Sequence, residues 1–393
     1  MANKKLTEAK NTKNDEFYTQ YEDIQREINA YLEYNPDVFK GKTVLLPCDD
    51  PEWSNFTRFF AQNFENFGLK KLISTSFAFE SKNFKEGYQL SIFEMESPQY
   101  DEDKTKTHGK IFTLTRDSNK SGVIDIDDLE WTYLEGDGDF RSDEVKALRD
   151  EADIIVTNPP FSLYRDFIEW LFENDKQFII IGNKNSVTYK ETFPLIMANK
   201  MWSGRSGWGG GMWFETKNSE DVDRVINGIN MKNVSSVWFT NMEHGKRHEP
   251  LSLMTMSDNL KFSKHIEIKE NGYQNYDNYD AIDVPYTDAI PSDYDGIMGV
   301  PVTFLEKYCP EQFEILGITL GNTVDYEMTT IYENAIQHNK NGSTQGGSKV
   351  NTRAAICVKE KPEDTVYYTA DNADGYLISV YPRILIRKKV SDK

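Results

Sequence analysis

Short apolar runs alternate with amphipathic stretches through the first half of the chain, and this alternation predicts strands followed by helices. At 14–35, Ile24 and Ile28 recur at helical spacing behind a cap at Asn14 or Asp15. Further helices are predicted at 57–68, 143–151 and 163–175. Strands are predicted at 41–47, 69–77, 152–161, 176–183 and 235–242. A strand, a polar turn, a helix and another strand are typical of a doubly wound α/β sheet, which binds ligands at the carboxyl ends of its strands.

The chain divides into parts of different character. A basic stretch at 1–13 is expected to be flexible, and the α/β core is predicted over 14–215 with an acidic hairpin insertion at about 82–136. From 216 to 393 the pattern changes to short strands and acidic loops, which predicts a second region of mixed α+β structure.

Three segments carry finer predictions. In the insertion, 109–116 and 121–127 are predicted to form the two strands of the hairpin. The Gly/Ser-rich segment at 339–349 is predicted to be a mobile loop, since such residues favour turns and place few side chains in a core.

Composition excludes a disordered or secreted, disulfide-built protein. With 393 residues, 38% of them hydrophobic and 13% aromatic, the chain can bury a substantial core. No apolar run is long enough to span a membrane or serve as a secretion signal, so a cytoplasmic protein is expected. The three cysteines are separated and form no C-x-x-C pair, so neither disulfides nor a metal site is expected.

The charge balance argues against a general nucleic-acid coat. The formal net charge is −19, whereas phosphate contacts need Lys and Arg. Basic residues nevertheless gather at the N-terminus, at 184–264 and at 340–361, away from the acidic stretches. A cationic face on an acidic body is one interpretation, and ordinary solvated surface charge is the other.

The segment from Thr157 to Phe161 follows an apolar strand and carries the clearest chemistry. Exocyclic amines of nucleobases are poor nucleophiles because their lone pair is delocalised. The amide oxygen of Asn158 and the carbonyl of Pro159 would accept the two amine hydrogens and localise that pair. Pro159 and Pro160 fix the backbone in advance, and Phe161 offers a ring for stacking, worth roughly 1–3 kcal/mol. A stiff strand-to-loop turn without chemistry is the alternative interpretation.

Here the sequence resembles the amino-methyltransferase superfamily, in which Asn/Asp-Pro-Pro-Phe/Tyr/Trp after the fourth strand is the catalytic loop and S-adenosylmethionine is the cofactor. Longer stretches resemble the EcoRI-type adenine-specific DNA methyltransferase family. These stretches are 45–56, 182–194, 238–251, 279–317 and 381–386. The resemblance extends over about 14–387. It implies a Rossmann-like class I methyltransferase core and a DNA target-recognition region within 216–393.

The resemblance also implies residues that bind the cofactor. Phe17, Tyr18 and Thr19 belong to a segment that precedes the first strand and lines the cofactor pocket in this family. After the third strand, Asp139 would accept from the adenine N6 of the cofactor, and Phe140 would pack on its ring.

One departure from the family pattern follows the first strand. Pro47, Cys48, Asp49 and Asp50 stand where a glycine-rich turn normally approaches the cofactor, and Asn158 is also expected beside it. Either the cofactor lies differently there, or the two carboxylates bind its cationic amino group. The alternative is that Asp49 and Asp50 only cap the next helix.

Residues expected at DNA come from the basic stretches and the polar run at 243–249, which suits phosphate or base-edge contact. They are Lys184, Asn185, Tyr189, Lys190, Arg205, His244, Lys246, Arg247, Lys349 and Arg353. For several of them an ordinary surface loop is the alternative. Trp202, Trp208 and Trp213 have the residue type for base stacking, but core packing is expected for at least two of them.

The function implied by the resemblance is transfer of a methyl group to N6 of a flipped-out adenine in a specific double-stranded DNA sequence. The enzyme is expected to be a monomer with a cognate restriction endonuclease acting separately. Two alternatives stay open. The same loop presents acceptors that suit RNA or a protein glutamine, and an acidic chain that has lost activity would act as a DNA mimic. Phe161 in place of Tyr and the long C-terminal region favour DNA.

Overall fold

The computed structural model describes residues 18–49, 54–78, 97–124, 126–216, 222–321 and 327–389. Its contacts divide the chain into two compact units. The first unit holds the chain up to Ser186 together with Met201–Gly245. The second holds Val187–Lys200 together with the chain from Lys246 onward. Each unit has its own sheets and its own core.

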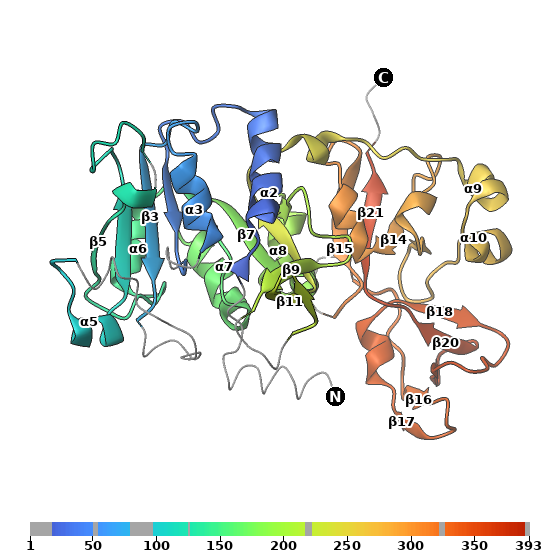
Figure 1. The fold of residues 1–393 in the computed structure, drawn as a ribbon. Coiled ribbons are helices and arrows are strands. Elements are labelled where there is room, and N and C mark those ends of the chain that lie inside the picture. The colour runs from blue at the N-terminus through green and yellow to red at the C-terminus, as the bar shows by residue number, and fades with distance from the viewer. Residues whose placement is uncertain are drawn as a thin grey trace. The chain divides into compact units, whose positions relative to one another are not determined.

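The first unit is built on an eight-stranded sheet (Figure 1). In spatial order its strands are β5 (Glu130–Tyr133), β4 (Lys110–Leu114), β3 (Lys71–Ser76), β2 (Thr43–Leu46), β6 (Ile154–Thr157), β7 (Gln177–Asn183), β12 (Ser236–Thr240) and β8 (Trp202–Ser203). The four central strands, β3, β2, β6 and β7, pair in parallel, and every other pair is antiparallel. The five strands expected from apolar runs are thereby confirmed. Parallel neighbours require crossover connections, as the alternation of strands and helices predicts.

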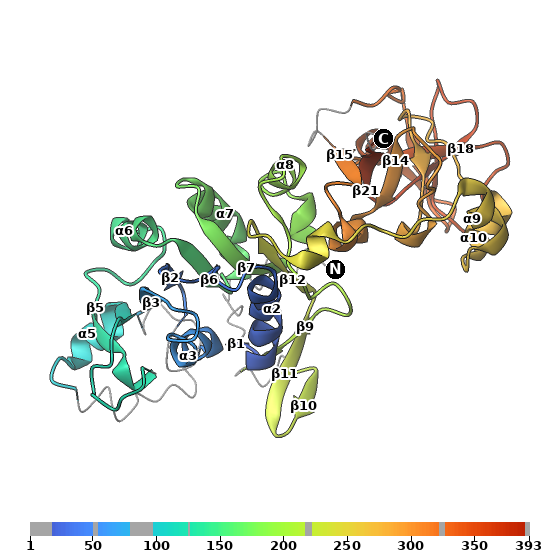
Figure 2. The same ribbon diagram turned by 90° about the horizontal axis from the view of Figure 1, so that it is seen from above.

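Helices cover both faces of this sheet (Figure 2). On one face lie α2 (Tyr21–Tyr34) and α3 (Asn55–Gln62), and on the other α6 (Asp143–Glu151) and α7 (Tyr164–Phe172). The short α5 (Glu102–Thr107) precedes β4. The expected α/β class is confirmed, and α6 coincides with the predicted helix. The side of α2 and α3 that faces the sheet is aromatic and aliphatic, because apolar residues at i, i+3 and i+4 share one face.

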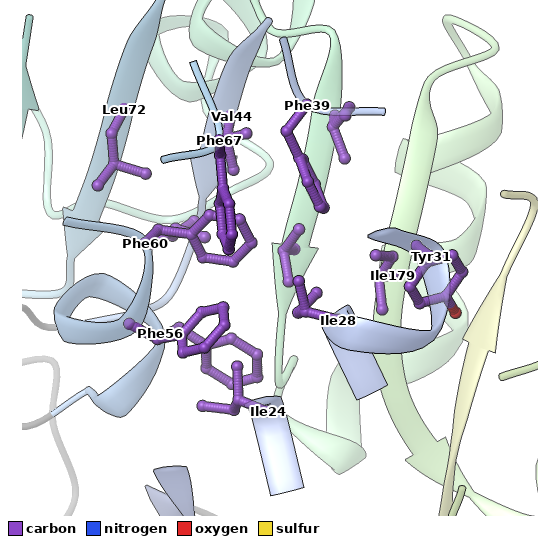
Figure 3. Close-up of a cluster of buried hydrophobic side chains, with 14 of the residues drawn as sticks. Ile24, Ile28, Tyr31, Phe39, Val44, Phe56, Phe60, Phe67, Leu72 and Ile179 are labelled. Carbon is purple, nitrogen blue, oxygen red and sulfur yellow. The ribbon is translucent and has the colours of Figure 1, made fainter. Parts of the chain in front are cut away.

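The core between these two helices and the sheet is visible in Figure 3. Ile24 and Ile28 of α2 meet Phe56 and Phe60 of α3, and all four pack with Val44 of β2. Each such side chain contributes about 1.5–3 kcal/mol when fully buried. This apolar layer therefore fixes both helices against the central strands.

The hairpin of the acidic insertion extends the main sheet, since β4 pairs with both β3 and β5. Strand β4 confirms the prediction at 109–116, but the second strand is β5 and not 121–127. The reason is a turn organised by Asp128, whose buried carboxylate accepts the backbone N–H groups of Ser118 and Asn119. Polar turn bonding therefore takes precedence over the apolar pattern there.

The N-terminal helix also differs from its prediction. Helix α2 begins at Tyr21 behind Gln20, and the residues before it form the short strand β1 (Tyr18–Thr19). Asn14 and Asp15, the expected caps, lie outside the described residues. Strand β1 opens a second, four-stranded sheet, followed in space by β9 (Met212–Glu215), β11 (Ile229–Val234) and β10 (Arg224–Ile226).

The boundary between the units differs from the expected one at 215/216. Strands β11 and β12 belong to the first unit, because β11 pairs with β9 and β12 pairs with β7. The segment Val187–Lys200, expected in the core, belongs to the second unit, where its helix α8 (Phe193–Met197) packs on β15 (Phe313–Ile318).

The second unit holds two sheets of its own. One has the order β13 (Ile282–Asp283), β14 (Met298–Pro301), β21 (Arg383–Lys388) and β15. The other has the order β17 (Thr344–Gly346), β16 (Ile336–His338), β19 (Tyr367–Thr369), β20 (Tyr376–Ser379) and β18 (Ala355–Val358). Helices α9 (Met256–Phe262) and α10 (Ile266–Asn271) complete this mixed α+β unit. None of the helices in the described ranges is long and apolar enough to cross a membrane.

Two segments singled out in the sequence lie in the second unit. The segment at 339–349 is not a plain loop, because β16 and β17 form a hairpin across it, closed by the Asn339 N–H bond to the Ser343 carbonyl. The stretch around 381–386 becomes β21, whose Arg383 pairs with Asp283 at 2.9 Å. Tyr276 donates to the same carboxylate, so this ion pair is part of a buried polar network.

Candidate functional site

The Asn158–Phe161 loop lies at the carboxyl end of β6, in the centre of the main sheet. Strand β6 is fully buried, and the loop enters a single 3-10 turn at Phe161–Leu163 before α7 begins. Asn158 and Phe161 are half-buried and Pro159 is buried. The predicted placement of this loop, after a buried central strand, is confirmed.

Strands β2 and β6 meet at the point where the chain order of the sheet reverses, since β3 lies on the far side of β2. In open α/β sheets ligands bind at such a switch point. Residues that follow β2 and β6, namely Cys48, Asp49 and Asn158, are therefore neighbours at the edge where the chemistry is expected.

Asp49 holds the ends of three central strands together. Its Oδ2 lies 2.7 Å from the hydroxyl of Thr157, at the end of β6, and its carbonyl accepts the hydroxyl of Ser74 in β3. Its Oδ1 accepts from Ser54 at 2.9 Å, and Ser54 is the N-cap of α3. Asp49 therefore does not itself cap the next helix, contrary to the capping interpretation, because Ser54 is the N-cap and Asp49 contacts the Ser54 hydroxyl. Asp50 lies outside the described residues.

Cys48 takes the place of the missing glycine in backbone conformation as well as in sequence. Its φ is +65°, in the left-handed region that favours glycine. The turn after β2 therefore keeps the geometry of a glycine turn, although a side chain is present. That side chain is half-buried.

This backbone gives a testable prediction. Cys48→Gly is expected to change the free energy of unfolding by less than about 1 kcal/mol, because relief of strain offsets the greater entropy of the unfolded chain. Cys48→Val is expected to lose about 2 kcal/mol, since a β-branched residue is poorly accommodated at positive φ. Urea denaturation of both variants checks this, and equal stability of the two would contradict the strained turn.

The segment ahead of the first strand also reaches this region. Strand β1 pairs with β9, so that Thr19 lies opposite Phe214. The carbonyl of Thr19 accepts from Asn55 in α3 at 2.8 Å. Phe214 meets the ring of Phe161 edge-on, with centroids 6.5 Å apart. Strand β1 is therefore linked through Phe214 to the Asn158–Phe161 loop. Phe17 lies outside the described residues.

The acidic turn that contains Gly138 and Asp139 lies beside the carboxyl end of β3. Gly138 has φ +88°, and a Cβ there would meet the carbonyl oxygen of Ser76 at 2.4 Å, so only glycine fits. Asp139 is half-buried and paired with Arg141. Phe140 requires a correction. It is 0% exposed between Phe167 and Trp170, so no part of its ring is open to a cofactor.

Two of the residues expected at DNA are buried and serve the fold. His244 is 2% exposed, with Nε2 near the carbonyl of Ser203, and Arg247 contacts Asn199 with its guanidinium over the ring of Tyr308. In the polar run at 243–249, some side chains are buried and others are exposed to solvent. The amino-acid sequence alone does not show which.

Lys184 and Lys246 are also engaged within the protein. Lys184 donates to the carbonyl of Trp208 at 2.6 Å, and Lys246 pairs with Glu306 at 3.2 Å. The remaining residues expected at DNA are exposed or half-buried. They are Asn185, Tyr189, Lys190, Arg205, Lys349 and Arg353. Trp202 and Trp208 are buried, as expected for at least two of the three tryptophans.

Sequence reasoning missed Glu27, which is fully buried on α2. Its carboxylate accepts from Tyr31, from the backbone N–H groups of Arg205 and Ser206, and from the Ser206 hydroxyl. Burial raises the pKa of Glu27 despite these four donors. The signal was present, since position 27 shares the apolar face of Ile24 and Ile28.

Comparison with known proteins decides the family. A sequence model described as adenine-specific methyltransferase EcoRI matches residues 5–389. The chain belongs to this family. Type II methyltransferase M.EcoRI from Escherichia coli is 41% identical over 326 residues, covering 81% of this chain and 90% of that protein. Type II methyltransferase M.MpnI from Mycoplasma pneumoniae is 33% identical over 344 residues, covering 82% and 89%. No solved structure matches the chain significantly.

Membership in the EcoRI family confirms the resemblance found in the sequence. The chain is an adenine-specific DNA methyltransferase, and S-adenosylmethionine is its methyl donor. The loop at Asn158 lies at the switch point of the sheet, where ligands bind in open α/β sheets.

Proposed function

We propose that the chain methylates N6 of an adenine flipped out of a specific double-stranded DNA sequence. In this proposal the first unit is a Rossmann-like class I core and the second unit is the target-recognition region. The observation that carries it is the position of Asn158, directly after the central strand β6 and beside the end of β2. The parallel centre of the sheet and helices on both faces support the class I assignment.

The roles of the loop follow from its acceptors and its rigidity. The adenine amino group would donate to the Asn158 amide oxygen and the Pro159 carbonyl, which turns its lone pair toward the methyl donor. Two prolines hold these acceptors before the base arrives, so little entropy is lost on binding. Phe161 stays half-buried against Phe214, so part of its ring is available for stacking.

S-adenosylmethionine supplies a methyl group on a positively charged sulfur. The residues that would hold it are Tyr18, Cys48, Asp49 and Asn158. They fit its chemistry, because the negative charge of the Asp49 carboxylate suits a cation. Thr19 and Pro47 are buried and support these four residues. We keep Asp139 among the residues proposed to bind the cofactor. Phe17 and Asp50 lie outside the described residues, and their proposed contact with the cofactor rests on the sequence alone.

A base inside the duplex cannot reach the end of a sheet strand, so the target must leave the stack. Of the residues expected at DNA, we retain Asn185, Tyr189, Lys190, Arg205, Lys349 and Arg353, which are exposed or half-buried. The Type II designation of the relatives favours a restriction-modification role with a separately acting endonuclease, and we propose that the chain acts on DNA as a monomer.

The substrate assignment is tested with labelled S-adenosylmethionine and duplex DNA, RNA or protein as acceptor. Label is expected in duplex DNA only, and nucleoside analysis is expected to give N6-methyladenine. Long-read sequencing of DNA from expressing cells would then show the modified sequence. Label in RNA or glutamine would favour the alternative acceptors. Absence of both label and cofactor binding would favour an inactive DNA mimic.

A further inference from the structure

The hairpin formed by β10 and β11 carries an apolar tip that the chemistry of the loop does not use. Its turn is Asn227–Gly228, with φ of +50° and +81°. These values are those of a type I′ turn, which joins two strands tightly and matches their twist. Directly before and after the turn, Ile226 and Ile229 lie opposite each other.

The apolar side chains at the tip are unusually exposed to solvent. Val225, Ile226 and Ile229 are 58%, 37% and 41% exposed. In the described part of the first unit, the other exposed large apolar residues are Tyr34 and Val123, which lie elsewhere in the sequence. Exposed apolar side chains gathered on one narrow projection mark an interaction site.

The base of the hairpin is firmly held. Asp223 pairs with Lys232 at 3.2 Å and accepts the backbone N–H of Asn233 at 3.0 Å. The guanidinium of Arg224 lies over the ring of Trp213, 5.2 Å from its centroid. The tip is therefore presented on a rigid stem, which extends away from the main sheet in Figure 2.

The stem is coupled to the catalytic loop. Strand β11 pairs with β9 so that Lys232 lies opposite Phe214, and Phe214 contacts Phe161. Ile229 comes three residues before Lys232, so it lies about 10 Å along the strand from this contact. A flipped adenine clamped at Phe161 would thus leave its gap in the duplex within reach of the tip.

Charge and shape favour DNA as the occupant. Between residues 222 and 234 the chain has two bases and one acid, in a protein whose net charge is −19. A two-stranded ribbon fits a groove of the duplex, and apolar side chains of proteins that distort DNA enter between base steps. A second copy of this chain would bring the same strongly negative charge.

We propose that the tip, Val225, Ile226 and Ile229, is a wedge that enters the base stack and fills the space left by the flipped adenine. This inference rests on the proposed base flipping. The wedge lowers the cost of extruding the base and does not touch the reacting atoms. Its loss should therefore matter only where the target adenine is stacked and paired.

The test compares Ile226→Ser/Ile229→Ser with Val123→Ser, a matched variant at a residue that is 55% exposed. Two duplexes with the recognition sequence are used, one with the target adenine paired and one with an abasic site opposite it. On the paired duplex the tip variant is expected to lose about 100-fold in kcat/KM, and on the abasic duplex less than about 3-fold. Val123→Ser should match the wild type on both.

Equal losses on both duplexes, or no loss on either, would overturn the wedge. So would a change of sedimentation coefficient in the tip variant without a change in methylation, since the tip would then be a contact between copies. A wild-type enzyme that methylates only unpaired adenine would refute the proposed function itself. These results separate failure of the wedge from failure of base flipping.

Discussion

Asn158→Ala is expected to lower kcat for adenine methylation by roughly 1000-fold, the size of effect seen when one aligned polar group is removed from a transition state. Without the amide oxygen, only the Pro159 carbonyl remains to draw the adenine lone pair out of the ring. The buried strand β6 and the Thr157–Asp49 contact do not involve the Asn158 side chain. Folding should therefore change little, and cofactor affinity, which Tyr18, Cys48 and Asp49 would still support, should fall much less than kcat.

The measurement is single-turnover methylation of duplex DNA, with cofactor binding and thermal unfolding recorded on the same samples. Asn66→Ala, at an exposed asparagine outside this loop and outside the residues proposed to bind DNA or the cofactor, is the matched control and should keep near wild-type turnover. Asn158→Asp retains an oxygen acceptor and is expected to keep part of the activity. Retained turnover in Asn158→Ala would remove Asn158 from the mechanism.

Glu27→Ala is expected to lower the free energy of unfolding by about 4 kcal/mol, because it leaves buried donors without an acceptor. These donors are the hydroxyl of Tyr31, the N–H groups of Arg205 and Ser206, and the Ser206 hydroxyl. Glu22→Ala, at an exposed position on the same helix, should stay within about 0.5 kcal/mol of wild type. Urea denaturation measures both.

The pH dependence separates a buried carboxylate from simple packing. Because burial raises the pKa of Glu27, the folded protein holds this proton more tightly than the unfolded chain. The contribution of Glu27 to stability is therefore fully present below the unfolded pKa near 4.5 and falls as the pH rises through the folded pKa. Glu27→Gln removes this titration. An unchanged pH profile in Glu27→Gln would contradict a titrating carboxylate.

Local sequence patterns were sufficient to predict a helix with one buried face or a strand with a continuous buried run of apolar residues. Strands β2, β6 and β7 were predicted because their apolar residues are continuous, and the short helix α6 was predicted at the residues where it is found. The position of the Asn158–Phe161 loop was predicted for the same reason, since its place at the sheet edge follows from the strand before it.

Pairing between residues that are far apart in the sequence could not be predicted from local sequence patterns. Strand β1 exists because Tyr18 and Thr19 pair with Glu215 and Phe214, far along the chain. The burial of His244 and Arg247 likewise depends on Ser203 and Asn199, which no local spacing reveals. Such polar residues resemble a surface loop until the tertiary partners that satisfy them are known.

The path of the chain through the two units constrains how this enzyme can be made and engineered. The chain leaves the first unit after Ser186, contributes α8 to the second, and returns at Met201 to supply β8 and β12. During synthesis, the first unit cannot complete its sheet until residue 240 has emerged, and α8 must wait for β15. Exchange of the second unit among relatives therefore needs two grafted pieces, 187–200 and the chain from 246, transferred together.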